Sequence, residues 1–164
     1  MGYCGLPGMC FLPDRVVAEL VSGGYVQPAG VDLTVAEVHV FRSPCILGVN
    51  SKAVAETEPV EPKGGFWRLR PGVYRITFGE VVRVPEDAIG FCYPRSTLVR
   101  SGATVCCAVW DPGYVGRGQA MLLVLNPHGL ILEVGAPVAQ LVFAKLAERP
   151  SRLYRGTYYG EGLR

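Results

Sequence analysis

Short apolar runs separated by turns dominate the hydrophobic pattern of this chain. The runs are rich in Val, Ile, Tyr and Phe, and Gly and Pro recur between them along the whole length. This pattern is typical of many short strands. The clearest expected strands are 38–41, 45–49, 73–78, 81–84, 88–92, 104–110, 120–126 and 138–146. The pattern therefore predicts an all-β domain.

Two of these runs say more about burial. In 73–78, Tyr74, Ile76 and Phe78 alternate with their neighbours, which predicts a strand with one buried face. Residues 121–125 are apolar throughout. That favours either burial on both faces or a contact between subunits.

Two short helices are expected among the strands. Residues 13–21 place Val and Leu on one face and Asp14 at the positive end of the helix. A second helix is expected over 96–101, with Ser96 as its N-cap and Gly102 as its terminator.

The remaining segments divide the chain into three parts. Residues 51–65 are polar and rich in Glu and Pro, and they predict a long surface loop. Residues 1–8 are expected to be an N-terminal extension, and 151–164 a flexible C-terminal arm rich in Gly and Tyr. One β domain over 9–150 lies between them.

The size and net charge of the chain exclude some classes of function. The chain has 164 residues and a net charge of +2, which fits one domain and is too balanced for a nucleic-acid coat or a polybasic membrane binder. Arg is far commoner than Lys, and its planar fork suits a small phosphate or carboxylate ligand. No apolar run is long enough to span a bilayer. We therefore expect a cytoplasmic protein that binds neither nucleic acid nor membrane.

The six cysteines do not predict a metal site. They form no C-x-x-C pair, and only His39 and His128 are available beside them. Buried thiols in a reducing compartment are the simpler interpretation. A bridge between Cys4 and Cys10 stays open.

Five segments together point to a known family. They are Ala29-Gly30-Val31-Asp32-Leu33, Pro94-Arg95-Ser96-Thr97-Leu98, Trp110-Asp111-Pro112-Gly113-Tyr114-Val115-Gly116, Gly135-Ala136-Pro137-Val138-Ala139-Gln140-Leu141-Val142-Phe143 and Tyr154-Arg155-Gly156-Thr157-Tyr158-Tyr159-Gly160. In this order and spacing they resemble the five motifs of the dUTPase and dCTP deaminase superfamily, with an N-terminal half most like the archaeal dUTPases. The resemblance implies a distorted β-barrel or jelly roll that forms a homotrimer, with active sites between subunits.

The residue that the deaminases need is replaced here. Members of that branch carry a Glu in the strand after the third motif, and alignment on Asn126 puts Leu123 at that position. The next carboxylate, Glu133, lies beyond a turn. A Leu side chain cannot move protons, so hydrolysis of dUTP to dUMP and pyrophosphate is favoured. A dCTP deaminase, a bifunctional enzyme and a non-catalytic nucleotide-binding trimer remain the alternatives.

The resemblance also implies residue roles. Asp111 would activate the water that attacks the α-phosphate, and Tyr114 would pack under the deoxyribose and exclude a 2′-hydroxyl. Asp32 would orient a hydrated Mg²⁺ through water. Tyr158 or Tyr159 would stack on the base. The expected phosphate or substrate contacts are Arg95, Ser96, Thr97, Arg100, Gln140 and Arg155. Taken alone, Asp111 in Asp-Pro-Gly is also an ordinary turn residue.

Overall fold

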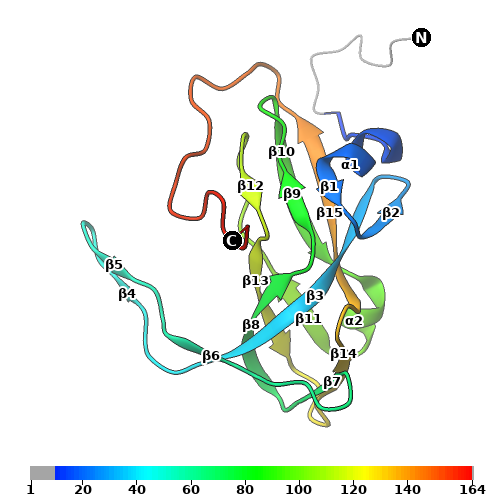
Figure 1. Cartoon of the computed structure of the whole chain (residues 1–164), viewed down its shortest axis with the longest axis vertical. Coiled ribbons are helices and arrows are strands. Elements are labelled where there is room, and N and C mark those ends of the chain that lie inside the picture. Colours follow the sequence, from blue (N-terminus) through cyan, green and yellow to red (C-terminus); the bar gives the residue numbers. More distant parts are fainter. Residues whose placement is uncertain (1–9, 164) are drawn as a thin grey trace.

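The computed structural model describes residues 10–163 and is built mainly from strands (Figure 1). The predicted extension, residues 1–8 with Cys4, lies outside the described residues. There are two short helices, α1 (Asp14–Leu20) and α2 (Ser96–Arg100). The strands are β1 (Val21–Ser22), β2 (Tyr25–Gln27), β3 (Gly30–Phe41), β4 (Ile46–Leu47), β5 (Lys52–Ala53), β6 (Thr57–Pro59), β7 (Phe66–Leu69), β8 (Gly72–Phe78), β9 (Val81–Arg83), β10 (Ala88–Pro94), β11 (Ala103–Cys106), β12 (Val115–Gly116), β13 (Gln119–Val124), β14 (Leu130–Glu133) and β15 (Pro137–Lys145).

The main sheet curls until its two edges meet. Its strands follow the order β10-β15-β3-β8-β13-β11, and every pairing is antiparallel. Gly90 on β10 and Trp110 after β11 exchange backbone hydrogen bonds of 2.9 and 3.0 Å, which joins the two ends of this order. A sheet that closes in this way leaves few unpaired edges. The predicted all-β, barrel-like fold with two short helices is confirmed.

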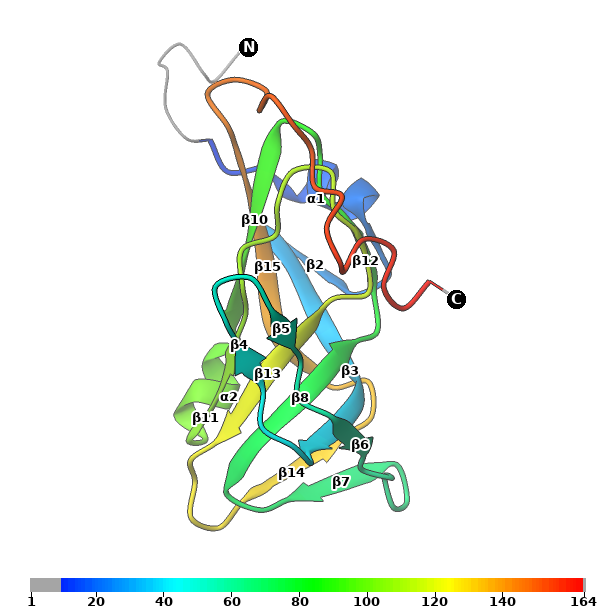
Figure 2. The ribbon, with the colours of Figure 1, turned by 90° about the vertical axis from the view of Figure 1, so that its left-hand side faces the viewer.

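Strand β3 connects the two parts of the main sheet. Its first half pairs with β15 and its second half with β8, so one strand of 12 residues runs through both parts of the sheet (Figure 2). The core behind it is filled by large apolar side chains that are fully buried. They include Phe78, Phe143, Leu33, Ile76, Leu122 and Leu141.

The two runs singled out in the sequence behave differently from each other. On β8, Tyr74, Ile76 and Phe78 are buried, as their alternation predicts. On and just beyond β13, Leu122 and Val124 are buried, whereas Met121 and Leu125 are exposed. Burial on both faces within one chain is therefore wrong for 121–125, because its outer face has no neighbouring layer in this chain.

Both predicted helices are present with nearly the expected bounds. Gly102 ends α2 with a φ of 76°, a conformation that favours Gly. The predicted cap of α2 is wrong, because Arg95 occupies the N-cap position and makes no side-chain cap hydrogen bond. No helix within residues 10–163 is long and apolar enough to cross a bilayer.

The predicted surface loop is more ordered than its composition suggests. Strands β4 and β5 form a small hairpin that projects from the body of the barrel, and β6 joins β3 at the base of that hairpin (Figures 1 and 2). Thus 51–65 is not one continuous loop, because two short strands within it find pairing partners.

Candidate active site

Three of the predicted site residues meet where β3 and β15 pair. Asp32 on β3 lies opposite Gln140 on β15. The Asp32 side chain is only 4% exposed, and its Oδ2 atom accepts a hydrogen bond of 2.8 Å from Gln27 and makes an ion pair of 3.1 Å with Arg95. A buried carboxylate is costly unless it is paired in this way. We call Gln27, Asp32, Arg95 and Gln140 the Asp32 cluster.

Helix α2 places the rest of the second motif beside this cluster. It begins directly after Arg95, whose backbone N–H donates to Val138 of β15 over 3.1 Å. Leu98 is buried and anchors the helix on the sheet, which leaves the side chains of Ser96, Thr97 and Arg100 exposed. Three further predicted contacts are therefore accessible next to the Asp32 cluster.

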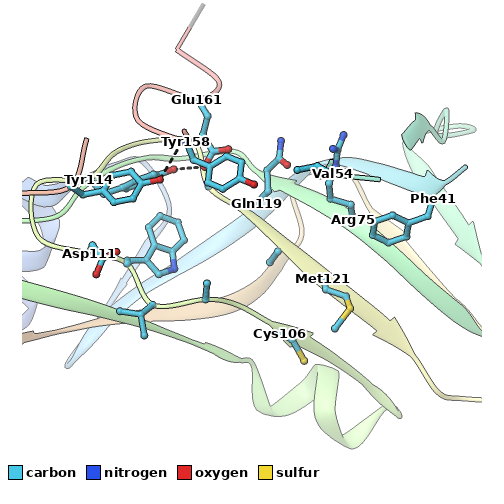
Figure 3. A pocket seen from close by; sticks show the side chains of 16 residues that line it. Phe41, Val54, Arg75, Cys106, Asp111, Tyr114, Gln119, Met121, Tyr158 and Glu161 are labelled. Carbon is cyan, nitrogen blue, oxygen red and sulfur yellow. Dashed lines mark hydrogen bonds between the residues drawn. The ribbon is translucent and has the colours of Figure 1, made fainter. Parts of the chain in front are cut away.

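The third motif borders a pocket of about 470 Å³ (Figure 3). The walls come from β13, from the Asp-Pro-Gly turn, from the base of the projecting hairpin and from the C-terminal arm. The lining residues are Phe41, Val54, Arg75, Cys106, Ala108, Val109, Trp110, Asp111, Tyr114, Gly118, Gln119, Ala120, Met121, Tyr154, Tyr158 and Glu161. Most of these walls are apolar, with a few polar groups, which is the usual character of a small-molecule site.

Asp111 is positioned by the residue before it. The backbone of Trp110 is bridged to Gly90, and its ring lies edge-on to Tyr114 at 5.3 Å between centroids. Gly118 makes room for this ring, because a Cβ atom there would lie 2.2 Å from the indole. Asp111 itself is exposed on the pocket wall, and its carbonyl accepts the Tyr114 N–H over 3.1 Å. The segment is thus both a turn and a pocket wall.

Tyr114 is almost completely covered. The residue is 7% exposed, and its hydroxyl donates to Glu161 Oε1 over 2.8 Å. Burial raises the pKa of the Tyr114 hydroxyl, and the Glu161 carboxylate beside it raises that pKa further. The hydroxyl therefore stays protonated and available as a donor.

The predicted arm residues lie close to this turn. Arg155 Nη1 donates to the carbonyl of Gly113 over 3.3 Å, and its guanidinium lies 4.6 Å from the centre of the Tyr159 ring. Tyr158 lines the pocket, whereas Tyr159 does not. Of the two rings that the sequence left open, Tyr158 is the one at the pocket.

The Asp32 cluster and the pocket are separate within one chain. Arg95 lies five residues along the chain from Gly90, which is bridged to Trp110. At about 3.3 Å per residue of strand, this corresponds to roughly 16 Å. None of Asp32, Arg95 and Gln140 lines the pocket that Asp111 borders. The structure thus brings the predicted residues together in two groups.

Two contributors were missed by sequence reasoning. Gln27 directly precedes the Pro28-Ala29 turn, and its amide, five residues before Asp32, is a local signal for this contact. Glu161 carried no signal, because its partner Tyr114 is 47 residues away in the sequence.

Comparison with known proteins places this architecture in a family. The profile of the dCTP deaminase-like family matches residues 12–146. The chain is 51% identical over 153 residues to a probable deoxyuridine 5′-triphosphate nucleotidohydrolase of Aeropyrum pernix, covering 92% of this chain and 96% of that protein. It is 39% identical over 140 residues to a protein of the same name from Archaeoglobus fulgidus, covering 84% of this chain and 82% of that protein.

Solved structures share the fold at lower identity. A 2′-deoxycytidine 5′-triphosphate deaminase from Agrobacterium tumefaciens superposes with a TM-score of 0.67 at 20% identity, over 87% of this chain; the chain spans only 50% of that protein's length. The EIAV dUTPase superposes with a TM-score of 0.51 at 15% identity, over 92% of this chain and 98% of that one. The fold is thus that of the dUTPase and deaminase barrels. The chain belongs to the dCTP deaminase-like family.

Proposed function

We propose that this protein hydrolyses dUTP to dUMP and pyrophosphate, with Asp111 activating the attacking water. One observation carries the proposal: Asp111 and Tyr114 stand together on the wall of a nucleoside-sized pocket. An aspartate that is accessible from such a pocket can accept a proton from water during attack on phosphorus. The archaeal relatives named as probable dUTP nucleotidohydrolases support the same reaction.

The pocket supports recognition of the sugar and base. Its volume of about 470 Å³ lies within the range of small-molecule sites. Tyr114 would carry the deoxyribose and exclude a ribose 2′-hydroxyl, and Tyr158 would cover the base. Gln119 supplies an amide at the same wall.

The Asp32 cluster and α2 support recognition of the phosphates. Arg95 presents a guanidinium, and the exposed side chains of Ser96, Thr97 and Arg100 follow it directly. Gln140 lies beside Asp32, and Arg155 would bind the terminal phosphate from the arm. A guanidinium paired with a phosphate gives strong, oriented hydrogen bonds.

Magnesium fits this donor set as an ion that arrives with the triphosphate. Mg²⁺ keeps several waters and needs only one or two protein carboxylates together with phosphate oxygens. Asp32 is the carboxylate of its cluster, and within residues 10–163 no group of three or more His, Cys, Asp or Glu side chains could form a protein cage. Asp32 would hold the hydrated ion through water, and the ion would neutralise phosphate charge.

We further propose that the working form is a homotrimer in the cytoplasm. None of Asp32, Arg95 and Gln140 lines the pocket of its own chain. Leu125, just beyond β13, is an exposed apolar side chain that offers a contact for a second copy. An active site formed between subunits would bring the two groups together.

A substrate panel tests the proposal against deamination. Strand β13 carries no carboxylate from Gln119 to Val124, and Leu123 is half-buried there, which supports hydrolysis rather than release of ammonia. We expect pyrophosphate from dUTP and none from UTP when dUTP, dCTP, UTP and dTTP are compared. Ammonia from dCTP would establish the deaminase alternative, and dUTP binding without pyrophosphate would establish the non-catalytic one.

A further inference from the structure

The C-terminal arm, residues 151–163, lies along the third-motif turn of its own chain. Three backbone hydrogen bonds of 2.8 Å hold it there: Tyr154 N–H to Pro112, Gly160 N–H to Val115, and Arg117 N–H to Glu161. These contacts tie the arm to the turn at both ends. A terminal segment without such contacts would be expected to be disordered.

The arm forms a wall of the pocket and does not fill it. Tyr158 and Glu161 line the cavity (Figure 3), and Tyr154 is a further lining residue. A volume of about 470 Å³ remains with the arm in place, which is enough for a nucleoside. The position of the arm therefore defines one side of the pocket.

One side-chain contact joins the arm to the residue proposed to carry the sugar. Glu161 accepts the hydrogen bond of the Tyr114 hydroxyl over 2.8 Å. The Tyr114 ring lies between Trp110, at 5.3 Å, and Tyr154 of the arm, at 5.9 Å. A buried hydroxyl that loses its partner is costly, so this contact stabilises the arm and the ring orientation together.

A second contact steadies the middle of the arm. Lys52, on the projecting hairpin, donates to Thr157 Oγ1 over 2.9 Å and lies 5.9 Å from the centre of the Tyr158 ring. Lys52 and Thr157 are both exposed, and exposed contacts of long side chains contribute little. Glu161 is therefore the stronger of the two attachments.

We propose that Glu161 is a positioning residue that fastens the arm to Tyr114 of the same chain and so completes the nucleotide pocket before the nucleotide arrives. This inference rests on the proposed function. It implies that the chain that supplies Asp111 and Tyr114 also closes its own pocket. Glu161 acts through Tyr114 and the arm, without taking part in the chemistry.

Hydrogen exchange on the full-length protein without nucleotide tests the attachment. In Glu161→Ala, we expect the amides of Tyr154 and Gly160 to lose about tenfold in protection, because the buried Tyr114 hydroxyl loses its acceptor. Tyr114→Phe removes the donor of the same bond and should give a similar loss. The double variant should lose no more than the larger single loss, since both changes remove one interaction.

Steady-state kinetics with dUTP test the consequence for the pocket. We expect Glu161→Ala to raise KM, by up to about tenfold, with kcat within about twofold of the unsubstituted protein. Glu161→Gln keeps an acceptor oxygen, so its KM should lie between those of Glu161→Ala and the unsubstituted protein. Glu148→Gln is the matched control, because Glu148 is exposed near the start of the arm and does not line the pocket.

The two measurements separate the attachment from the proposed function. Unchanged protection in Glu161→Ala, or additive losses in the double variant, would overturn the attachment. A KM that is unchanged or lower would overturn its role in the pocket. Loss of protection in a protein that leaves dUTP intact would instead refute the proposed function and keep the attachment.

Discussion

The Asp32 cluster and the pocket are built by different means. Asp32 and Gln140 stand on two long paired strands in the middle of the sheet, and the carboxylate is buried and held by two partners. Asp111 and Tyr114 stand on a turn, and the arm that covers Tyr114 is held mainly by a few hydrogen bonds. The first group is fixed by paired strands, whereas the second depends on a terminal segment that few contacts hold in place. Under the proposed function this difference is useful, because rigidity helps to hold phosphates and a sugar and base pocket must admit its ligand.

The largest effect should come from Asp111→Asn. The amide cannot accept a proton from water, so we expect turnover of dUTP to fall about 10²- to 10⁴-fold. Binding of dUTP should remain largely intact, because Asp111 is exposed and supports no other side chain. Initial rates and equilibrium binding measure the two quantities, and near-normal turnover would remove Asp111 from the mechanism.

Asp32→Ala should chiefly affect stability and phosphate binding. It leaves Gln27 and Arg95 without their shared acceptor, and we expect a loss of about 1–3 kcal/mol in the free energy of unfolding, moderated because Arg95 reaches solvent. Urea denaturation measures this loss. Gln27→Met removes only one of the two partners of Asp32, so it should lower the free energy of unfolding by less than Asp32→Ala does. An equal loss would show that Arg95 contributes nothing to holding Asp32.

Gly118→Ala should damage the pocket while sparing the Asp32 cluster. The new Cβ atom would lie 2.2 Å from the Trp110 ring, and the overpacking should cost at least about 1 kcal/mol. We expect the tryptophan fluorescence, to which Trp110 contributes together with Trp67, to change and KM for dUTP to rise. A variant with unchanged fluorescence and stability would show that the Trp110 ring has room that the structure does not indicate.

The smallest expected effect is the pH dependence of arm closure through Glu161. Burial raises the pKa of the Glu161 carboxyl, although the Tyr114 hydrogen bond and the charge of Arg75 act in the opposite direction. A carboxyl whose pKa is higher in the closed arm binds its proton more tightly there, so closure is favoured below the ordinary value of 4.5 and weakens as pH rises above it.

Hydrogen exchange of the Gly160 amide, corrected for its intrinsic rate, should show this as a modest fall in protection as pH rises above that value. Glu161→Gln should abolish the dependence, because the amide does not titrate. A dependence that persists in this variant would assign the effect to another group.

Much of the sheet could be predicted from local patterns, and β3 shows where such prediction fails. Of that strand, only residues 38–41 are among the clearest expected strands, because Asp32 and Thr34 interrupt the apolar pattern of the strand-like segment before them. Both polar side chains are accommodated by partners from elsewhere: Asp32 by Arg95, and Thr34 by Glu80, whose carboxylate accepts from its N–H and hydroxyl over 2.9 and 2.7 Å. No window of neighbouring residues reveals those partners.

In the candidate site, too, some residues could be found from local motifs and others could not. The sequence motifs were enough to find Asp111, Tyr114 and the residues around Arg95, because each of these motifs is a short segment of neighbouring residues. The contact between Glu161 and Tyr114 joins residues 47 positions apart, so it depends on which segments lie together after folding.

The amino-acid sequence alone determined the all-β class, the alternating burial of β8 and the five motif segments, because these depend on residues close together in the chain. Only the tertiary structure decided that the predicted site residues form two groups in one chain and that Glu161 holds Tyr114. Those outcomes depend on the closure of the barrel and on contacts between distant segments, which side-chain periodicity does not encode.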